Sequence, residues 1–95
     1  NKSRVRDRLR ACLVMIFELA RREPETVMFL TSIADSDATV PALVQAEIQA
    51  EISDANIAEH LTVSCLAIAR GIAQGRIAPG RSSDHVDLLM RVVSP

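Results

Sequence analysis

Residues 66–93 read LAIARGIAQGRIAPGRSSDHVDLLMRVV, and this stretch predicts two consecutive helices separated by a tight turn. The first part keeps an apolar helical stripe up to Gly75, and glycine readily takes the left-handed conformation that ends many helices. Pro79 and Gly80 prevent the helix from continuing. Ser82 or Ser83 can then cap the next helix, in which apolar residues recur at i, i+3, i+4 and i+7, namely Val86, Leu89, Met90 and Val93.

The rest of the chain also has helical patterning. Residues 3–22 carry apolar side chains at three- and four-residue spacing, which predicts an amphipathic helix that ends before Pro24. Pro24 suits the first turn of a second, shorter helix, which the polar residues 34–37 close. Residues 41–74 continue the pattern with a phase shift near Ser53, so they form either one long helix, which we favour, or two helices joined by a local cap at Ser53.

These elements predict an all-α fold. No stretch shows the strict alternation of apolar and polar residues that is typical of strands. The 95 residues are enough for one small domain with a modest core. We therefore expect a single domain over residues 1–95, built as an antiparallel helical bundle of four to five helices.

Charge is distributed unevenly along the chain. The first ten residues carry five basic side chains and one acidic side chain, whereas residues 23–69 contain eight acidic residues and no Lys or Arg. Such an acidic middle repels the phosphates of nucleic acids. The basic run Arg4, Arg6, Arg8 and Arg10 points around much of its helix, and we interpret it as a solvated face or a domain contact rather than a nucleic-acid site.

Several features indicate a cellular location. The chain begins at Asn1 without the flanks of a signal peptide, and we expect it to be a piece of a longer cytoplasmic protein. Its longest uncharged apolar stretches are far shorter than the roughly 20 residues that cross a bilayer, so no membrane segment is predicted. Cys12 and Cys65 lie among aliphatic residues, which favours reduced, buried thiols.

Enzymatic chemistry finds little support in the spacing of polar residues. No Glu is followed by His three residues later, as a carboxylate dimetal centre in a bundle requires. His60 and Cys65 diverge by about 140° around a helix, too far for a nucleophile and its base. His85 lies in the first turn of the last helix, where it is more simply a surface or interface residue. We expect no enzyme, no cofactor and no metal site.

The apolar residues exceed what a small helical core obviously needs. Residues 28–30 cannot all face one core, so some apolar surface should remain. Although such residues are often plain core, they could line a cavity for a small apolar ligand. The candidate ligand-binding residues are Met15, Leu19, Met28, Phe29, Ile33, Ile48, Ile52 and Leu66. Gly71, four residues before Gly75, is a candidate for close packing.

The order of these segments resembles the C-terminal ligand-binding and dimerisation region of TetR-type transcriptional regulators. The resemblance covers nearly the whole chain. It rests on a first helix that runs into ARREPE at residues 20–25, a short helix, a long helix that ends in GIAQGRI at 71–77, and a next helix that opens with DHVDLL at 84–89.

The resemblance implies a homodimeric regulator whose N-terminal helix-turn-helix reads DNA while the C-terminal helices enclose an effector. No helix-turn-helix precedes the first helix here, and the chain ends one helix short of the pair that usually forms the dimer interface, so DNA would be bound only through a domain outside this chain. The implied dimer contacts are Val86, Leu89, Met90 and Val93, and the implied ligand is a small, largely apolar effector. A helical oligomerisation or protein-docking module without a ligand, using the acidic middle against a basic partner, is the alternative.

Overall fold

The computed structural model describes residues 2–93, with the side chains of residues 2, 3 and 79 left out of the description. Within that range the chain is all-α, as predicted, and forms five α-helices without a strand. The elements are α1 (Lys2–Arg22), α2 (Pro24–Ser36), α3 (Thr39–Gln49), α4 (Ala55–Ala73), a short 3-10 turn (Pro79–Arg81) and α5 (Ser82–Val93).

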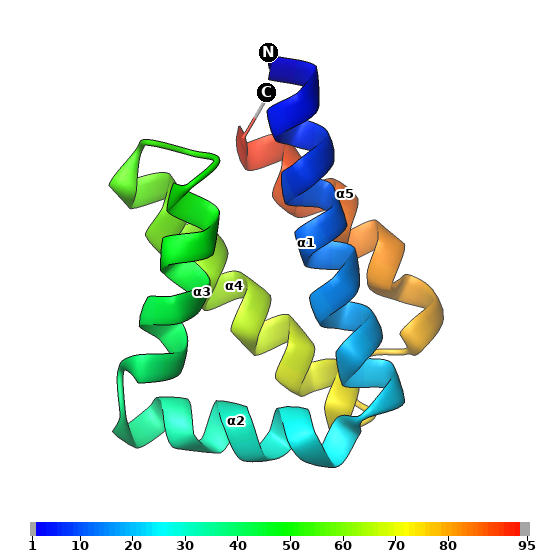
Figure 1. Ribbon diagram of the computed structural model, residues 1–95. Coiled ribbons are helices and arrows are strands. Elements are labelled where there is room, and N and C mark those ends of the chain that lie inside the picture. The colour runs from blue at the N-terminus through cyan, green and yellow to red at the C-terminus, as the bar shows by residue number, and fades with distance from the viewer. Residues whose placement is uncertain (1, 94–95) are drawn as a thin grey trace.

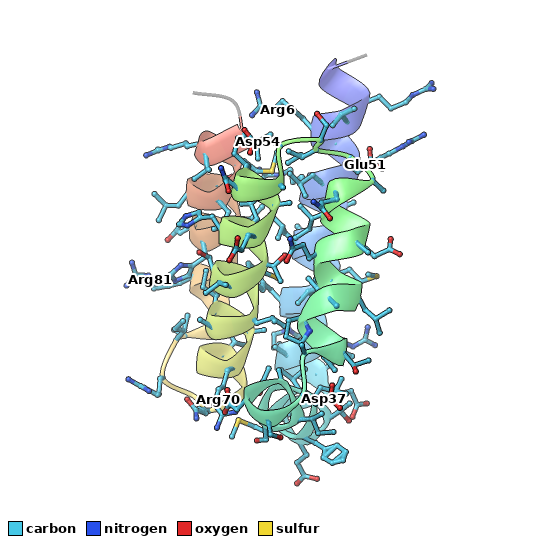
Figure 2. The ribbon with its side chains drawn as sticks, turned by 90° about the vertical axis from the view of Figure 1, so that its left-hand side faces the viewer. Arg6, Asp37, Glu51, Asp54, Arg70 and Arg81 are labelled. Atoms are coloured by element: carbon cyan, nitrogen blue, oxygen red, sulfur yellow. The ribbon has the colours of Figure 1, made fainter. Side chains whose placement is uncertain are left out.

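The helices form two layers. Figure 2 shows α4 (yellow-green) and α5 (orange to red) on the left and α1 (blue) and α3 (green) on the right. Helix α2 crosses one end of this arrangement (Figure 1). Helix α4 packs against all four of the other helices, so it forms the centre of the fold.

The core lies mainly between α1, α4 and α5. Each of these helices directs one apolar stripe inward, which is the arrangement expected of amphipathic helices in a small bundle. The largest fully buried side chains are Leu9, Leu13, Phe17, Ile48, Leu61, Thr62, Cys65 and Val86. The buried hydroxyl of Thr62 is satisfied because it donates to the carbonyl oxygen of Ala58 at 2.8 Å.

The favoured single long helix over residues 41–74 is wrong, because the chain forms two helices there. Helix α3 ends at Gln49, and α4 begins after Asp54. The carboxylate of Asp54 accepts hydrogen bonds from the backbone N–H groups of Asn56 and Ile57, at 2.9 and 3.2 Å. The break lets each helix turn its own apolar stripe towards the core, which the phase shift near Ser53 would prevent in one straight helix.

The end of α4 agrees with the prediction. Gly75 has φ 76°, the left-handed conformation that suits glycine. The N–H groups of Arg76 and Gly75 donate to the carbonyl oxygens of Gly71 and Ile72, which is the Schellman arrangement. Gly71 is buried, and a Cβ there would lie 2.6 Å from Cδ1 of Ile77. The close packing at Gly71 is therefore against the loop that follows α4 rather than against another helix.

Helices α2 and α3 meet at a sharp corner. Pro24 lies in the first turn of α2, and residues 34–37 close it, as predicted. In the turn, Asp37 Oδ1 accepts hydrogen bonds from the backbone N–H and the hydroxyl of Thr39, at 2.8 and 2.5 Å.

Within residues 2–93, no single helix is both long enough and apolar enough to cross a bilayer. Helices α2 and α3 meet those criteria only when they are taken together, as a pair bent by 101°.

Candidate functional site

The eight residues predicted to bind an apolar ligand are divided between the surface and the core. Met15, Leu19 and Phe29 are exposed, Phe29 by 62%. Ile48 and Ile52 lie in or against the core, and the remaining three, Met28, Ile33 and Leu66, are half-buried. This distribution differs from the single apolar cavity that the sequence predicted. The expectation that residues 28–30 leave apolar surface is confirmed.

Two of the eight residues share a hollow on α1. Met15 and Leu19 line it together with Glu18, Arg22 and Glu23, and its volume is about 370 Å³. The pairing of Arg21 with Glu18 lies on the same stretch of helix and lowers the pKa of the Glu18 carboxyl. This hollow is thus an apolar floor with a charged rim, open to solvent.

The predicted dimer contacts on α5 lie inside the chain's own core. Val86 is 1% exposed, Leu89 and Met90 are also buried, and Val93 packs against them. Val86, Leu89 and Met90 are covered by the chain itself, which argues against them as dimer contacts, whereas Val93 is only partly buried. Helical periodicity identified a buried stripe correctly but could not tell whether the chain itself or a second copy covers it.

The opposite side of α5 exposes two apolar side chains among charged ones. Leu88 is 53% exposed and Val92, one turn further on, is 38% exposed. On α4, Val63 and Ala67 are likewise exposed and one turn apart, on the side of that helix away from its buried stripe. These four residues define what we call the α4–α5 face.

The arginine run of α1 is used partly within the chain. Arg8 Nη1 lies 3.6 Å from Glu51 Oε1, which joins α1 to the turn after α3. Arg10 Nη1 lies 2.8 Å from Asp87 Oδ1, which joins α1 to α5. Both pairs are largely solvated, so they orient the helices more than they stabilise them. Arg4 and Arg6 are exposed, which agrees with the interpretation of the run as a solvated face. Figure 2 labels Arg6.

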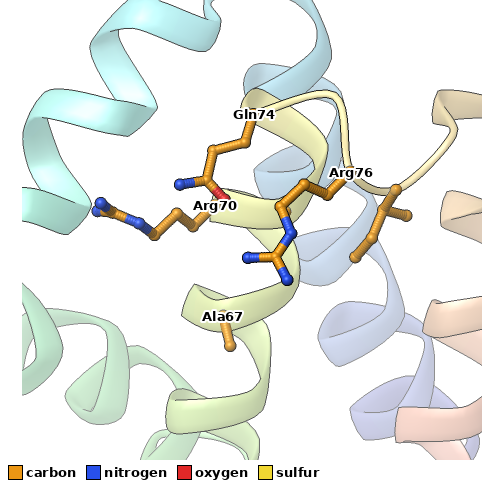
Figure 3. A pocket seen from close by; sticks show the side chains of 6 residues that line it. Ala67, Arg70, Gln74 and Arg76 are labelled. Atoms are coloured by element: carbon orange, nitrogen blue, oxygen red, sulfur yellow. The ribbon is translucent and has the colours of Figure 1, made fainter.

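A second hollow, which sequence analysis missed, lies at the C-terminal end of α4. We call it the arginine hollow, and Figure 3 shows the residues that line it. Its volume is about 450 Å³, and its lining residues are Ala67, Arg70, Gly71, Gln74, Arg76 and Ile77. Ala67 contributes only a methyl group, and the lining contains two guanidinium groups and one amide but no acidic residue. The spacing of Arg70 and Gln74, one turn apart, was the available signal.

Arg70 connects this hollow to α2. Its Nη1 donates hydrogen bonds to Thr31 Oγ1 at 3.1 Å and to Ser32 Oγ at 3.3 Å. Thr31 is only 6% exposed, and its hydroxyl donates in turn to the carbonyl oxygen of Val27 at 2.8 Å. The guanidinium is therefore held in place by neutral oxygen atoms.

The cysteines are unsuited to nucleophilic chemistry. Burial, with a smaller contribution from Cys12, raises the pKa of the Cys65 thiol to about 12. Burial and the charge of Glu47 raise the pKa of Cys12 as well. Both are free thiols, as predicted. Within residues 2–93, no group of three or more His, Cys, Asp or Glu side chains is placed to hold a metal ion.

Comparison of the chain with protein-family models, with curated proteins and with solved structures finds no match in any of the three.

Proposed function

We propose that this chain is the effector-sensing and dimerisation domain of a TetR-type transcriptional regulator, whose DNA-binding helix-turn-helix lies outside the chain. The order and character of the helical segments support the proposal. The observation that carries it is that α5 exposes two apolar side chains on the side away from its buried stripe. One side of α5 completes the core, and Leu88 and Val92 on the other side need cover that the chain itself does not supply.

A second copy of the chain is the cover that the α4–α5 face fits best. Two adjacent helices that expose small and medium apolar side chains can pack against the same pair from a partner and form a four-helix arrangement with two-fold symmetry. Burying each Leu or Val side chain contributes about 1.5–3 kcal/mol. Asp84 and Arg91, exposed on the same helix, would then lie at the polar rim.

Signalling in this proposal passes through α1. The DNA-binding domain joins the arginine-rich start of that helix, and a small apolar effector bound among α1, α2 and α3 changes its tilt. The response depends on the difference between the effector's affinities for the two orientations, typically about 1 to 3 kcal/mol of coupling.

Sedimentation equilibrium tests the dimer. We expect a concentration-dependent mass that approaches twice the 10.4 kDa of the chain. Leu88→Asn or Val92→Asn should weaken the dimer about tenfold or more, given the apolar burial lost. Leu43→Asn is the matched control, because Leu43 is an exposed apolar residue on α3, in the other layer. A monomer at all concentrations, or equal effects of all three variants, would refute this interface.

DNA binding and effector binding have their own tests. The protein as its own cells make it, purified intact, should select DNA fragments that contain an inverted repeat, because a two-fold dimer reads two half-sites. A panel of small apolar compounds should include some that raise the melting temperature of the chain.

A protein-docking module without a ligand is the second candidate. It is favoured by the division of the eight predicted ligand residues between surface and core. A panel that produces no thermal shift, together with self-association that persists, would support this candidate over the regulator.

A further inference from the structure

The arginine hollow concentrates hydrogen-bond donors around an open space. Arg70 and Arg76 contribute guanidinium groups and Gln74 contributes an amide, while Ala67 contributes only a methyl group. Figure 3 shows that the labelled side chains come from the last turns of α4 and from the loop that follows it in the chain. A guanidinium group carries five N–H donors in a planar fork that matches the oxygen atoms of carboxylates and phosphates.

Among the described residues, no ion pair neutralises the positive charge at this hollow. The described ion pairs involve Arg8, Arg10, Arg21 and Arg81. No carboxylate among the described residues lies within 4.0 Å of Arg70 or Arg76. Arg70 is half-buried, and its recorded side-chain partners are the hydroxyls of Thr31 and Ser32. A partly desolvated cation held by neutral groups gains more than a fully solvated one from an anion placed beside it.

The end of α4 does not oppose an anion as an open helix C-terminus would. Unpaired carbonyl oxygens at that end carry partial negative charge and repel anions. Here the carbonyl oxygen of Gly71 accepts from the N–H groups of Arg76 and Ile77, and that of Ile72 accepts from Gly75. The Schellman arrangement therefore occupies acceptors that would otherwise face the hollow.

From these observations we propose that the arginine hollow binds an oxyanion, the carboxylate or phosphate group of a small ligand, between Arg76, Gln74 and Arg70. The volume of about 450 Å³ falls in the range of small-molecule sites. This site lies apart from the proposed apolar effector site and adjoins the α4–α5 face, with which it shares Ala67. It does not depend on the regulator function.

Titration of the isotope-labelled chain, followed by two-dimensional NMR, tests the site. The probes are inorganic phosphate and citrate, each compared with sodium chloride at the same ionic strength. We expect saturable shifts of the backbone signals of Gly71, Gln74 and Arg76 and of the Arg70 side-chain N–H. Saturation with phosphate alone identifies a phosphate site, and saturation with citrate alone identifies a carboxylate site. Non-saturating shifts that are equally large at Arg91, outside the hollow, would overturn the proposal.

Substitutions separate this site from general attraction of anions to a basic surface. Arg76→Gln should weaken binding about tenfold or more, as expected for loss of a charged hydrogen-bond partner. Arg81→Gln is the matched control, since it removes the same charge from an exposed side chain that pairs with Asp84 and does not line the hollow. Its affinity should stay within about twofold of the unmodified chain. Equal affinities for Arg76→Gln and the unmodified chain would refute the site.

Arg76 is the better position for this test than Arg70. Arg76 is exposed, and its recorded hydrogen bond comes from its backbone N–H, so Arg76→Gln should leave the fold intact. Arg70→Gln removes the hydrogen bonds to α2 and can alter stability. An unchanged melting temperature for Arg76→Gln, measured in the absence of the probes, confirms that the loss of binding is local.

Discussion

Asp54 Oδ1 lies 2.9 Å from the backbone nitrogen of Asn56, and this hydrogen bond caps the start of α4, which residues 50–54 separate from α3. The same oxygen accepts from Ile57 at 3.2 Å. Asp54→Ala leaves both donors without the side-chain partner, so we expect a loss of about 1 kcal/mol in the free energy of unfolding. Urea denaturation measures it. Asp54→Asn, which keeps an acceptor oxygen, should retain most of the stability, and a loss as large as that of Asp54→Ala would contradict the capping role.

Gly75 and Gly80 offer a matched pair for testing backbone strain. Gly75 has a positive φ of 76°, whereas Gly80 does not, and a Cβ at either position would find open space. Gly75→Ala should therefore destabilise the chain by about 1–2 kcal/mol because of conformation alone. Gly80→Ala should stay within about 0.5 kcal/mol of the unmodified chain. Similar effects at the two positions, seen by thermal or urea unfolding, would mean that the left-handed conformation is not what Gly75 provides.

Asp37 should titrate below its usual range because the hydroxyl and the backbone N–H of Thr39 both donate to its carboxylate. A lowered pKa in the folded state means that the stabilisation is present above the unfolded pKa and is lost as pH falls through the folded pKa. NMR titration should find that Thr39→Ala raises the pKa of Asp37 towards its ordinary value. An unchanged pKa in that variant would show that the hydroxyl contributes nothing.

The Cys65 thiol should make the chain less stable in alkaline solution. Its pKa of about 12 in the folded state lies above that of the unfolded chain, where the thiol is solvated. The stability gained by keeping the thiol neutral is complete below the unfolded pKa and is lost as pH rises towards 12. We expect the free energy of unfolding to fall between pH 8 and pH 11.

A Cys65→Ala variant should show a smaller fall over the same pH range, measured by urea denaturation. Alkylation gives an independent readout, because in a Cys12→Ala background Cys65 should react only as fast as the chain opens. Rapid alkylation of the folded chain at pH 8 would contradict the buried position of this thiol.

Much of the fold could be predicted from local chemistry. Pro24 and Gly75 mark helix boundaries because their backbone preferences act without help from distant residues. The break before α4 was harder to predict, since residues 50–53 have no Pro or Gly. The break is favourable because it lets α3 and α4 each turn an apolar stripe towards the core. Local propensity gives way to tertiary contacts at such a point.

The surfaces were less predictable than the helices. The stripe on α5 that contains Val86 was recognised, but its assignment to a partner was wrong because α1 covers it. The lining of the arginine hollow is local, within residues 67–77, but the contact that holds Arg70 there comes from Thr31, a residue 39 positions earlier in the chain. Periodicity within one helix carries no information about which side chain of another helix will lie opposite.

The guanidinium group of Arg70 donates hydrogen bonds to two side chains of α2, Thr31 and Ser32. Both hydrogen bonds come from Nη1, so an oxyanion that engages Nη1 competes with those hydroxyls for its N–H groups. If anion binding weakens the hydrogen bonds from Arg70 to α2, those hydrogen bonds weaken anion binding by the same free energy. The two effects are equal because linkage between two equilibria is reciprocal. An oxyanion bound at the end of α4 would thus weaken the attachment of α2 through Arg70, without touching α2 itself.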